Sequence, residues 1–213
     1  MTRYRQPIER PSQQRRAQYA ASTHNAIIDA AGRLFAQQGY FATTVDQIAR
    51  LADVSPATVY AVAGGKQGLI HSLVKRWTES PILEEGLRRL PTLTDPFEVV
   101  SYVAQASRQV RDQHGDIMRT LLATAPSHPE MAQELDTSTD RYRRTLGKVA
   151  EHLGELGVPG GTGYIGDVLW FFFGYSGYFT LVDDNRWSYD RAQQWLLARC
   201  AQTLGINAPE GAS

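Results

Sequence analysis

The chain has 213 residues, of which 42% are hydrophobic, so it can bury a core in one or two domains. A single cysteine, Cys200, excludes an intrachain disulfide, and the first residues lack the apolar stretch of a secretory signal, so we expect a cytoplasmic protein. The most apolar region, residues 165–182, is interrupted by Asp167 and by three glycines. This favours a buried core helix over a membrane span.

The 22 basic and 22 acidic residues balance overall but are distributed unevenly along the chain. Residues 1–76 carry 10 Lys and Arg against 4 Asp and Glu, whereas residues 77–213 carry 12 against 18. This division favours a polyanion-binding head on a body that does not touch the polyanion. Uneven surface charge without a function gives the same asymmetry, so the signal needs support from a motif.

Residues 1–22 hold five arginines and two prolines with almost no apolar periodicity, which predicts a basic flexible arm. Most of this arm is expected to be a solvated tail. Arg15 and Arg16 lie nearest the first predicted helix, where they could follow a DNA backbone or enter a minor groove.

A first helix is predicted from about residue 23, because apolar residues then recur at steps of three and four up to Gly39. Thr44 and Gln47 have the spacing of a capping box, which starts a second helix. Ser55 is the expected N-cap of a third helix, with Pro56 at its first position. The glycines at 64 and 65 limit this third helix to about two turns.

Two short helices joined by residues 52–55 and packed on a longer helix predict a helix-turn-helix unit. The second short helix of such a unit fits the major groove of DNA. Asp53 occupies the position of the turn that tends to need left-handed backbone, which Asp adopts more readily than most residues other than glycine.

The rest of the chain predicts helices and no convincing strand. The expected ranges are 66–77, 96–113, 115–125, 129–156, 164–182 and 189–205. We therefore expect an all-α protein of about nine helices. Its domains would be a DNA-binding domain at 23–68 and a ligand-binding and dimerisation domain at 69–207.

The stretch "AIIDAAGRLFAQQGYFATTVDQIARLADVSPATVYAVAGGKQGLI", residues 26–70, strongly resembles the DNA-binding domain of the tetracycline-repressor (TetR) family of bacterial regulators. The shared elements are Ala-Ala-x-x-Leu-Phe, Gly-Tyr, Thr-Thr-Val, Ile-Ala, Val-Ser, Thr-Val-Tyr and Gly-Lys, all at the expected intervals. Beyond residue 70 the resemblance rests on helix number and on the "DDNRWSYDRAQQWL" ending.

The resemblance implies a homodimer that reads a palindromic operator in double-stranded DNA and dimerises through its last two helices, with a body that binds a small inducer. By position, phosphate contacts would come from Thr44, Tyr60 and Lys66, and base contacts from Pro56, Ala57 and Thr58, next to the cap Ser55. The alternatives are a simple cap for Thr44, a core ring for Tyr60 and a solvated Lys66. Two departures are Asp53 for a common glycine, and Ala63 where an aromatic often ties the third helix to the fourth.

Residues 164–182 carry aromatics around the whole helix, so both sides should be covered, one by a cavity and the other by a dimer mate. The set favours a pocket for an apolar or aromatic compound, although core packing is a better explanation than ligand contact for any single ring. The candidate ligand-binding residues are Tyr102, His114, Arg119, Tyr142, Asp167, Trp170, Phe171, Gly174 and Tyr178.

Catalysis is disfavoured. The five histidines lack metal-ligand spacing, and "GGTG" at 160–163 lacks the Lys-Ser/Thr of a phosphate loop. No cofactor or metal is expected. Three hypotheses remain: a ligand-released repressor, a regulator answering to a protein partner or to none, and a helical enzyme or carrier that has lost DNA binding. Tyr60, Lys66 and the second-helix cap argue against the last.

Overall fold

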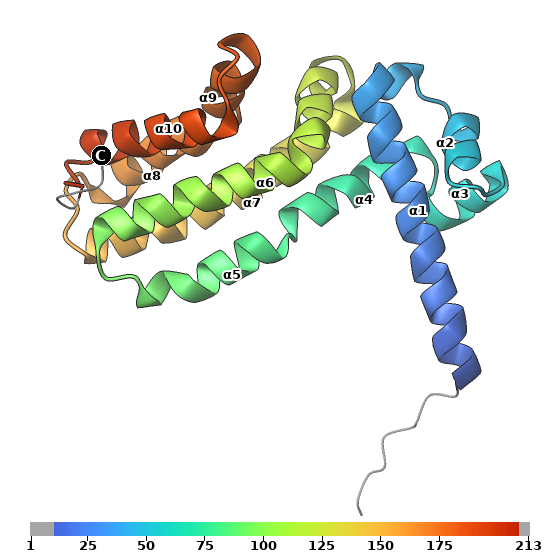
Figure 1. The fold of residues 1–213 in the computed structure, drawn as a ribbon, viewed down its shortest axis with the longest axis horizontal. Helices are drawn as coiled ribbons and strands as arrows, with labels where there is room; N and C mark the ends of the chain where they lie inside the picture. The colour runs from blue at the N-terminus through green and yellow to red at the C-terminus, as the bar shows by residue number, and fades with distance from the viewer. Residues whose placement is uncertain (1–10, 209–213) are drawn as a thin grey trace, which may run out of the picture. The chain divides into compact units, whose positions relative to one another are not determined.

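The computed structural model describes the backbone of residues 11–208 and the side chains of residues 15–208. This part of the chain is helical and contains no strand, which confirms the all-α prediction (Figure 1). The chain divides into two compact units, Met1–Leu73 and Val74–Ser213. The division falls inside α4 (Lys66–Thr78), a few residues after the boundary predicted at residue 68.

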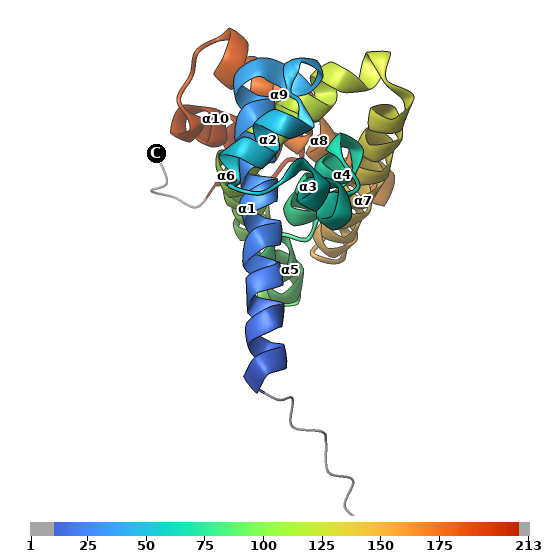
Figure 2. The same ribbon diagram turned by 90° about the vertical axis from the view of Figure 1, so that its right-hand side faces the viewer.

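The first unit contains α1 (Pro11–Ala42), α2 (Val45–Leu51), α3 (Pro56–Ala63) and the start of α4. Within it, α1 contacts both α2 and α3, and α2 packs on α3. Figure 2 shows α2 and α3 gathered beside the C-terminal half of α1, with the N-terminal half extending beyond them. Buried apolar side chains from all four helices form the core, including Ile27, Ile28, Phe35, Tyr40, Ile48, Ala49, Val59, Leu69 and Ile70.

The prediction of an irregular arm is wrong for residues 11–22, because α1 already begins at Pro11. No glycine or further proline interrupts the sequence before Gly32, and its Gln, Ala and Arg residues have high helix propensity. The side chains of residues 15–22 are exposed, which explains why no apolar periodicity marks this part of the helix. Residues 1–10 of the predicted arm lie outside the described residues.

The second unit consists of the end of α4 followed by α5 (Pro81–Arg89), α6 (Pro96–Thr124), α7 (Pro129–Glu155), α8 (Gly161–Phe173), α9 (Tyr175–Phe179) and α10 (Tyr189–Thr203). Short helical turns follow α5 at Leu90–Thr92 and α6 at Ala125–Ser127, and a π-helical turn, Thr180–Asp184, follows α9. Helices α6, α7, α8 and α10 enclose one hydrophobic core.

Three predicted boundaries in this unit are wrong. No helix was predicted between residues 77 and 96, but Pro81 starts α5, since proline suits the first turn of a helix. The predicted helices 96–113 and 115–125 form the single helix α6, in which Gly115 is buried. The predicted helix 164–182 breaks at Gly174, whose ψ of −179° is extended.

The segment Gly161–Asp184 is, among the described residues, the one stretch with the length and hydropathy of a membrane-crossing helix. In this fold 56% of its most apolar window is buried. Ile165, Leu169 and Phe173 belong to the core of the second unit. The hydropathy of the segment is thus explained by its place in a protein core.

Candidate functional site

The N-terminus of α2 has the predicted capping box. The backbone N–H of Gln47 donates to Thr44 Oγ1 over 3.2 Å, and the backbone N–H of Thr44 donates to Gln47 Oε1 over 2.8 Å. Gln38 Nε2 on α1 also donates to Gln47 Oε1, over 3.0 Å, and so ties α2 to α1. Thr44 is exposed, so its role as a cap leaves it accessible to a nucleic acid.

The turn between α2 and α3 has the backbone that the sequence predicts. Asp53 has φ 54°, in the left-handed region. Ser55 caps α3, because its hydroxyl accepts the backbone N–H of Thr58 over 3.1 Å and lies 2.8 Å from the Thr58 hydroxyl. Ser55, Pro56 and Ala57 are exposed, whereas Val59 is fully buried. The first turn of α3 therefore presents small side chains to solvent.

Replacing Asp53 with glycine is expected to stabilise the protein by about 1 kcal/mol, because glycine has no Cβ to crowd the left-handed conformation. Urea unfolding monitored by circular dichroism measures this change. Asp53→Asn is the matched control, since it removes the charge and keeps the side-chain shape. A gain in Asn as large as in Gly would assign the effect to charge rather than to backbone strain.

Tyr60 and Lys66 lie on either side of the turn between α3 and α4. Tyr60 is 58% exposed, so the core-ring alternative is wrong. Its ring covers Gly65, where an added Cβ would lie 3.0 Å from Tyr60 Cε1. Lys66 Nζ lies 4.3 Å from the centroid of the Tyr40 ring, and partial burial lowers the pKa of Lys66. Tyr40 was not among the predicted DNA-binding residues, although the Gly-Tyr pair marked its position.

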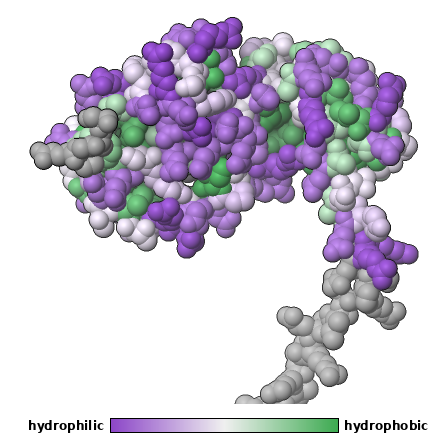
Figure 3. Space-filling view, in the orientation of Figure 1, coloured by the Kyte–Doolittle hydropathy of each residue, from purple (hydrophilic) through white to green (hydrophobic). Residues whose placement is uncertain are grey.

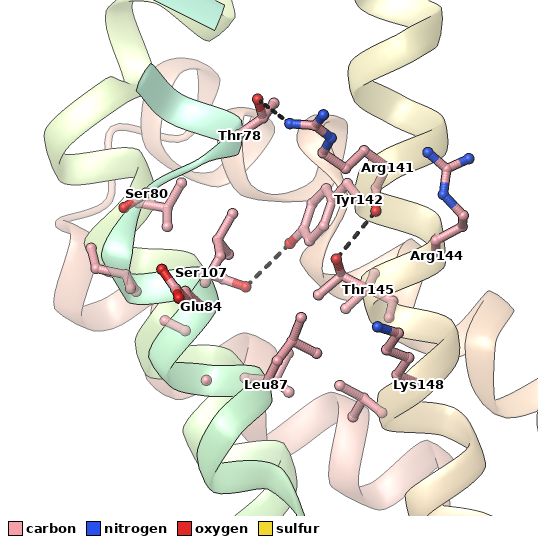
Figure 4. Close-up of a pocket in the computed structure, with 18 of the residues that line it drawn as sticks. Thr78, Ser80, Glu84, Leu87, Ser107, Arg141, Tyr142, Arg144, Thr145 and Lys148 are labelled. Atoms are coloured by element: carbon pink, nitrogen blue, oxygen red, sulfur yellow. Dashed lines mark hydrogen bonds between the residues drawn. The ribbon is translucent and has the colours of Figure 1, made fainter. Parts of the chain in front are cut away.

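The second unit contains a cavity of about 760 Å³. Its walls come from the end of α4 and from α5, α6 and α7, and Figure 4 shows side chains from these helices facing one another across it. Half of the lining residues are aliphatic or aromatic, including Trp77, Ile82, Leu83, Leu87, Val103, Val110, Leu146 and Val149. Figure 3 shows hydrophobic surface between α5 and α6, surrounded by hydrophilic surface. A volume and lining of this kind suit a small organic ligand.

Two of the predicted ligand residues, Tyr102 and Tyr142, line this cavity. Asp167 and Phe171 lie instead at a shallow surface hollow with Tyr164 and Thr203. The structure places the other five candidates outside both, namely His114, Arg119, Trp170, Gly174 and Tyr178. The prediction relied on the aromatic helix after residue 164, whereas the unpredicted helix α5 supplies one wall.

Most of the candidates outside the cavity have structural partners. Arg119 forms two hydrogen bonds of 2.7 Å with the Asp183 carboxylate, which raises the pKa of Arg119. The buried Tyr178 hydroxyl donates to the Tyr189 carbonyl over 3.2 Å. The Trp170 ring packs edge-on against Tyr142, with centroids 5.6 Å apart.

His114 is partly buried, and burial together with the nearby Arg76 lowers its pKa. Cys200 is buried, which raises the pKa of its thiol to about 12 and makes the thiolate inaccessible near neutral pH. Within residues 15–208 no group of three or more His, Cys, Asp or Glu side chains is arranged to hold a metal ion.

Arg111 also lines the cavity and was not among the predicted ligand-binding residues. It is only 2% exposed, and its guanidinium donates to the carbonyls of Ser107, Phe173 and Gly174 over 3.0, 2.6 and 2.9 Å. The signal was available in the sequence, because Arg111 follows Val103, Ser107 and Val110 on the inward face of α6. A charged residue on such a face requires an explanation from its surroundings.

Residues 27–73 match the family described as "Bacterial regulatory proteins, tetR family". The chain is 29% identical over 129 residues to an uncharacterized HTH-type transcriptional regulator, YdeS, of Bacillus subtilis, covering 59% of this chain and 61% of that protein. It is 36% identical over 90 residues to the HTH-type transcriptional regulator HbdR of Aromatoleum, covering 42% and 39%. The matched segments thus span less than two thirds of these relatives.

Solved structures share the fold over most of their length. The TetR family regulator PfmR from Thermus thermophilus superposes with a TM-score of 0.64 at 21% identity, over 85% of this chain and 95% of that one. FadR from Bacillus subtilis, determined in complex with stearoyl-CoA, superposes with a TM-score of 0.68 at 18% identity, over 82% and 96%. With its helix-turn-helix unit and its helical second unit, the chain resembles the TetR family of transcriptional regulators, and residues 27–73 match that family directly.

Proposed function

We propose that the protein is a cytoplasmic, homodimeric repressor that leaves a palindromic operator when a small apolar or aromatic compound enters its second unit. The observation that carries this proposal is the cavity of about 760 Å³ with its largely apolar lining, which a DNA-binding protein controlled only by a partner does not need. The match of residues 27–73 to the TetR family supports the role of a DNA-binding transcriptional regulator.

The proposed DNA contacts divide by chemistry. Thr44, Tyr60 and Lys66 supply hydroxyl and ammonium donors to phosphate groups. Pro56, Ala57 and Thr58, beside the cap Ser55, face base edges in the major groove, where small and methyl-bearing side chains contact thymine. The exposure of Ser55, Pro56, Ala57 and Tyr60 supports this assignment.

Helix α4 joins, along the chain, the residues proposed to bind DNA and the residues that line the cavity. It begins with Lys66 and ends with Thr78, and its last residues, Trp77 and Thr78, line the cavity. A ligand acts as an inducer when it binds the conformation that does not fit DNA more tightly than the one that does. Because FadR of Bacillus subtilis was crystallised with stearoyl-CoA, this fold accommodates an acyl compound in at least one relative.

The dimer is proposed to form through α8 and α10. Phe171 is 73% exposed, and Tyr164 on α8 and Trp195 on α10 are also exposed aromatics. Large apolar side chains at adjoining surface positions are a common mark of a protein interface. The shallow hollow that Phe171 lines gives a second copy a recess to fill.

The variant Phe171→Glu is expected to convert the dimer to a monomer and to weaken operator binding by more than tenfold, since a buried unpaired charge at an interface costs several kcal/mol. Sedimentation velocity measures the first effect and fluorescence anisotropy the second. Val62→Glu, which also replaces an exposed apolar residue but lies on α3, should stay dimeric. A dimeric Phe171→Glu protein would place the interface elsewhere.

The proposal as a whole is tested by selecting bound sequences from random duplex DNA and then titrating the recovered operator. A two-fold symmetric consensus, an affinity that falls steeply with salt, and release by compounds from an apolar and aromatic panel are expected. A sequence without symmetry would contradict the dimer. Operator affinity that no compound changes, although compounds bind the protein, would contradict induction by ligand.

A further inference from the structure

Two residues that line the cavity each carry a buried polar atom without a hydrogen-bond partner. The atoms are Nε of Arg111 and Oγ of Ser80, and each residue is only 2% exposed. Both atoms are N–H or O–H donors, and leaving such a donor unpaired away from water costs about 1–3 kcal/mol. A cavity wall that carries unpaired donors fits a ligand that carries acceptor oxygens.

The charge of Arg111 is only partly compensated by the protein. All three hydrogen bonds of its guanidinium go to neutral backbone carbonyls, two of them at the C-terminal end of α8. The partial negative charge at a helix C-terminus is about half an elementary charge. A buried guanidinium without a carboxylate partner is costly, and an anion bound beside it would remove that cost.

Hydroxyl groups extend the polar part of this wall. Ser107 precedes Arg111 by one turn of α6, and its Oγ lies 3.3 Å from the Tyr142 hydroxyl, which donates to the Phe173 carbonyl over 2.7 Å. Figure 4 shows Ser107 and Tyr142 joined across the cavity from facing helices. Since Tyr142 directs its proton to Phe173, Ser107 is the donor in this pair, and it can donate to a ligand oxygen only in place of Tyr142.

The charged residues of the lining also favour a ligand with negative charge. Arg111, Arg141, Arg144 and Lys148 are basic, and Glu79 and Glu84 are acidic. Glu79 already lies 3.8 Å from Arg141, which makes it a partner for that residue. The remaining balance is positive, so the cavity attracts an anion.

We propose that the effector is an apolar carboxylate, a fatty acid or aryl-alkanoic acid, whose carboxylate binds Nε of Arg111 with help from the hydroxyls of Ser80 and Ser107. Its chain then lies against Leu83, Leu87 and Val149. This inference rests on the proposed control by a ligand in the cavity and names the chemical class of that ligand. An acyl-CoA, whose thioester end is neutral, is the competing source of an acyl chain.

The test compares decanoate with decanol, and phenylbutyrate with phenylbutanol, by isothermal titration calorimetry of the protein without DNA. Each acid is expected to bind at least about tenfold more tightly than its alcohol, as charge-assisted hydrogen bonds imply. Equal affinities for acid and alcohol would contradict recognition of a carboxylate. They would leave the proposed control by an apolar ligand intact. Decanoyl-CoA binding more tightly than decanoate would assign the site to the thioester.

Three variants test which residues make the protein bind the acid more tightly than the alcohol. Arg111→Met should abolish the difference between acid and alcohol, and Arg143→Met, which lies outside the cavity, should preserve it. Because Arg111→Met also removes the donor to three carbonyls and can impair folding, Ser80→Ala is the second test. Its hydroxyl has no partner to lose, so the fold should persist while decanoate affinity falls several-fold and decanol affinity stays unchanged. An unchanged decanoate affinity in Ser80→Ala and Arg111→Met would overturn the site.

A spectroscopic readout works on the unaltered protein. The carboxyl carbon resonance of carboxyl-labelled decanoate is followed by nuclear magnetic resonance as the pH is lowered. Beside a guanidinium the ionised form is favoured, so the pKa of the bound carboxyl should lie below that of the free acid. A bound carboxyl with a raised pKa would show an apolar surrounding without Arg111 and would contradict the proposal.

Discussion

Replacing Lys66 with alanine and Tyr60 with phenylalanine is expected to weaken operator binding at least about tenfold at low salt and to make it less salt-dependent. The two residues lie on either side of the turn between α3 and α4, where Tyr60 is 58% exposed and Lys66 Nζ lies over the Tyr40 ring. Each phosphate contact contributes about 0.9 to the slope of log affinity against log salt concentration, so losing one lysine contact in each protomer of a dimer should reduce the slope by about 2.

Fluorescence anisotropy with the selected operator, repeated at several salt concentrations, measures both effects. Lys75→Ala is the matched control, because Lys75 is an exposed lysine in the last turn of the same helix. It should change the affinity and the slope much less. If the double variant binds as the unaltered protein does, with the same slope, Lys66 and Tyr60 do not contact phosphates.

Gly68→Ala is expected to destabilise the first unit by about 3 kcal/mol, at the upper end of what overpacking costs, and to reduce operator affinity more than tenfold. A Cβ at Gly68 would lie only 1.6 Å from the Ala63 carbonyl oxygen. That oxygen belongs to the backbone at the end of α3, so a rotamer change cannot relieve the clash. The end of α3 or the start of α4 must move. A shift of α3 moves Tyr60, and a shift of α4 moves Lys66.

Urea unfolding and operator titration check this expectation. Gly147→Ala on α7 is the control, since an added Cβ there meets nothing within 4 Å. It should stabilise the protein by up to about 1 kcal/mol, as alanine does in place of glycine within a helix. A Gly68→Ala protein with unchanged stability and unchanged operator affinity would mean that α3 and α4 can separate without loss.

The local chemistry of the first unit could be predicted from the sequence because its signals are short-range. Thr44 and Gln47 form a capping box, Ser55 caps α3, and Asp53 has left-handed backbone, all within a few residues of one another. A cap or a turn depends on side chains next to it in the chain, so its sequence signature is nearly complete. The first turns of α1 were missed because the side chains of residues 15–22 are exposed, and an exposed stretch of helix has no apolar stripe.

In the second unit, the tertiary structure decided where the helices begin, continue and break. Pro81 reads equally well as a helix breaker or as the first residue of α5, and Gly115 lies within α6 rather than ending it. Gly174 breaks the aromatic helix where Arg111, more than 60 residues earlier, donates to the freed carbonyls. Bonds between residues so far apart in the chain leave no local pattern.

The sequence by itself therefore determined the resemblance of residues 26–70 to the TetR family, the all-α class and the backbone of the turn between α2 and α3, whose interactions are local. Only the folded chain decided where the cavity lies, that α5 forms one of its walls, and that Arg111 and Ser80 line it with unpaired donors. A cavity is the space left between helices that are distant in sequence. Its shape and charge follow from how those helices pack rather than from the pattern of any one of them.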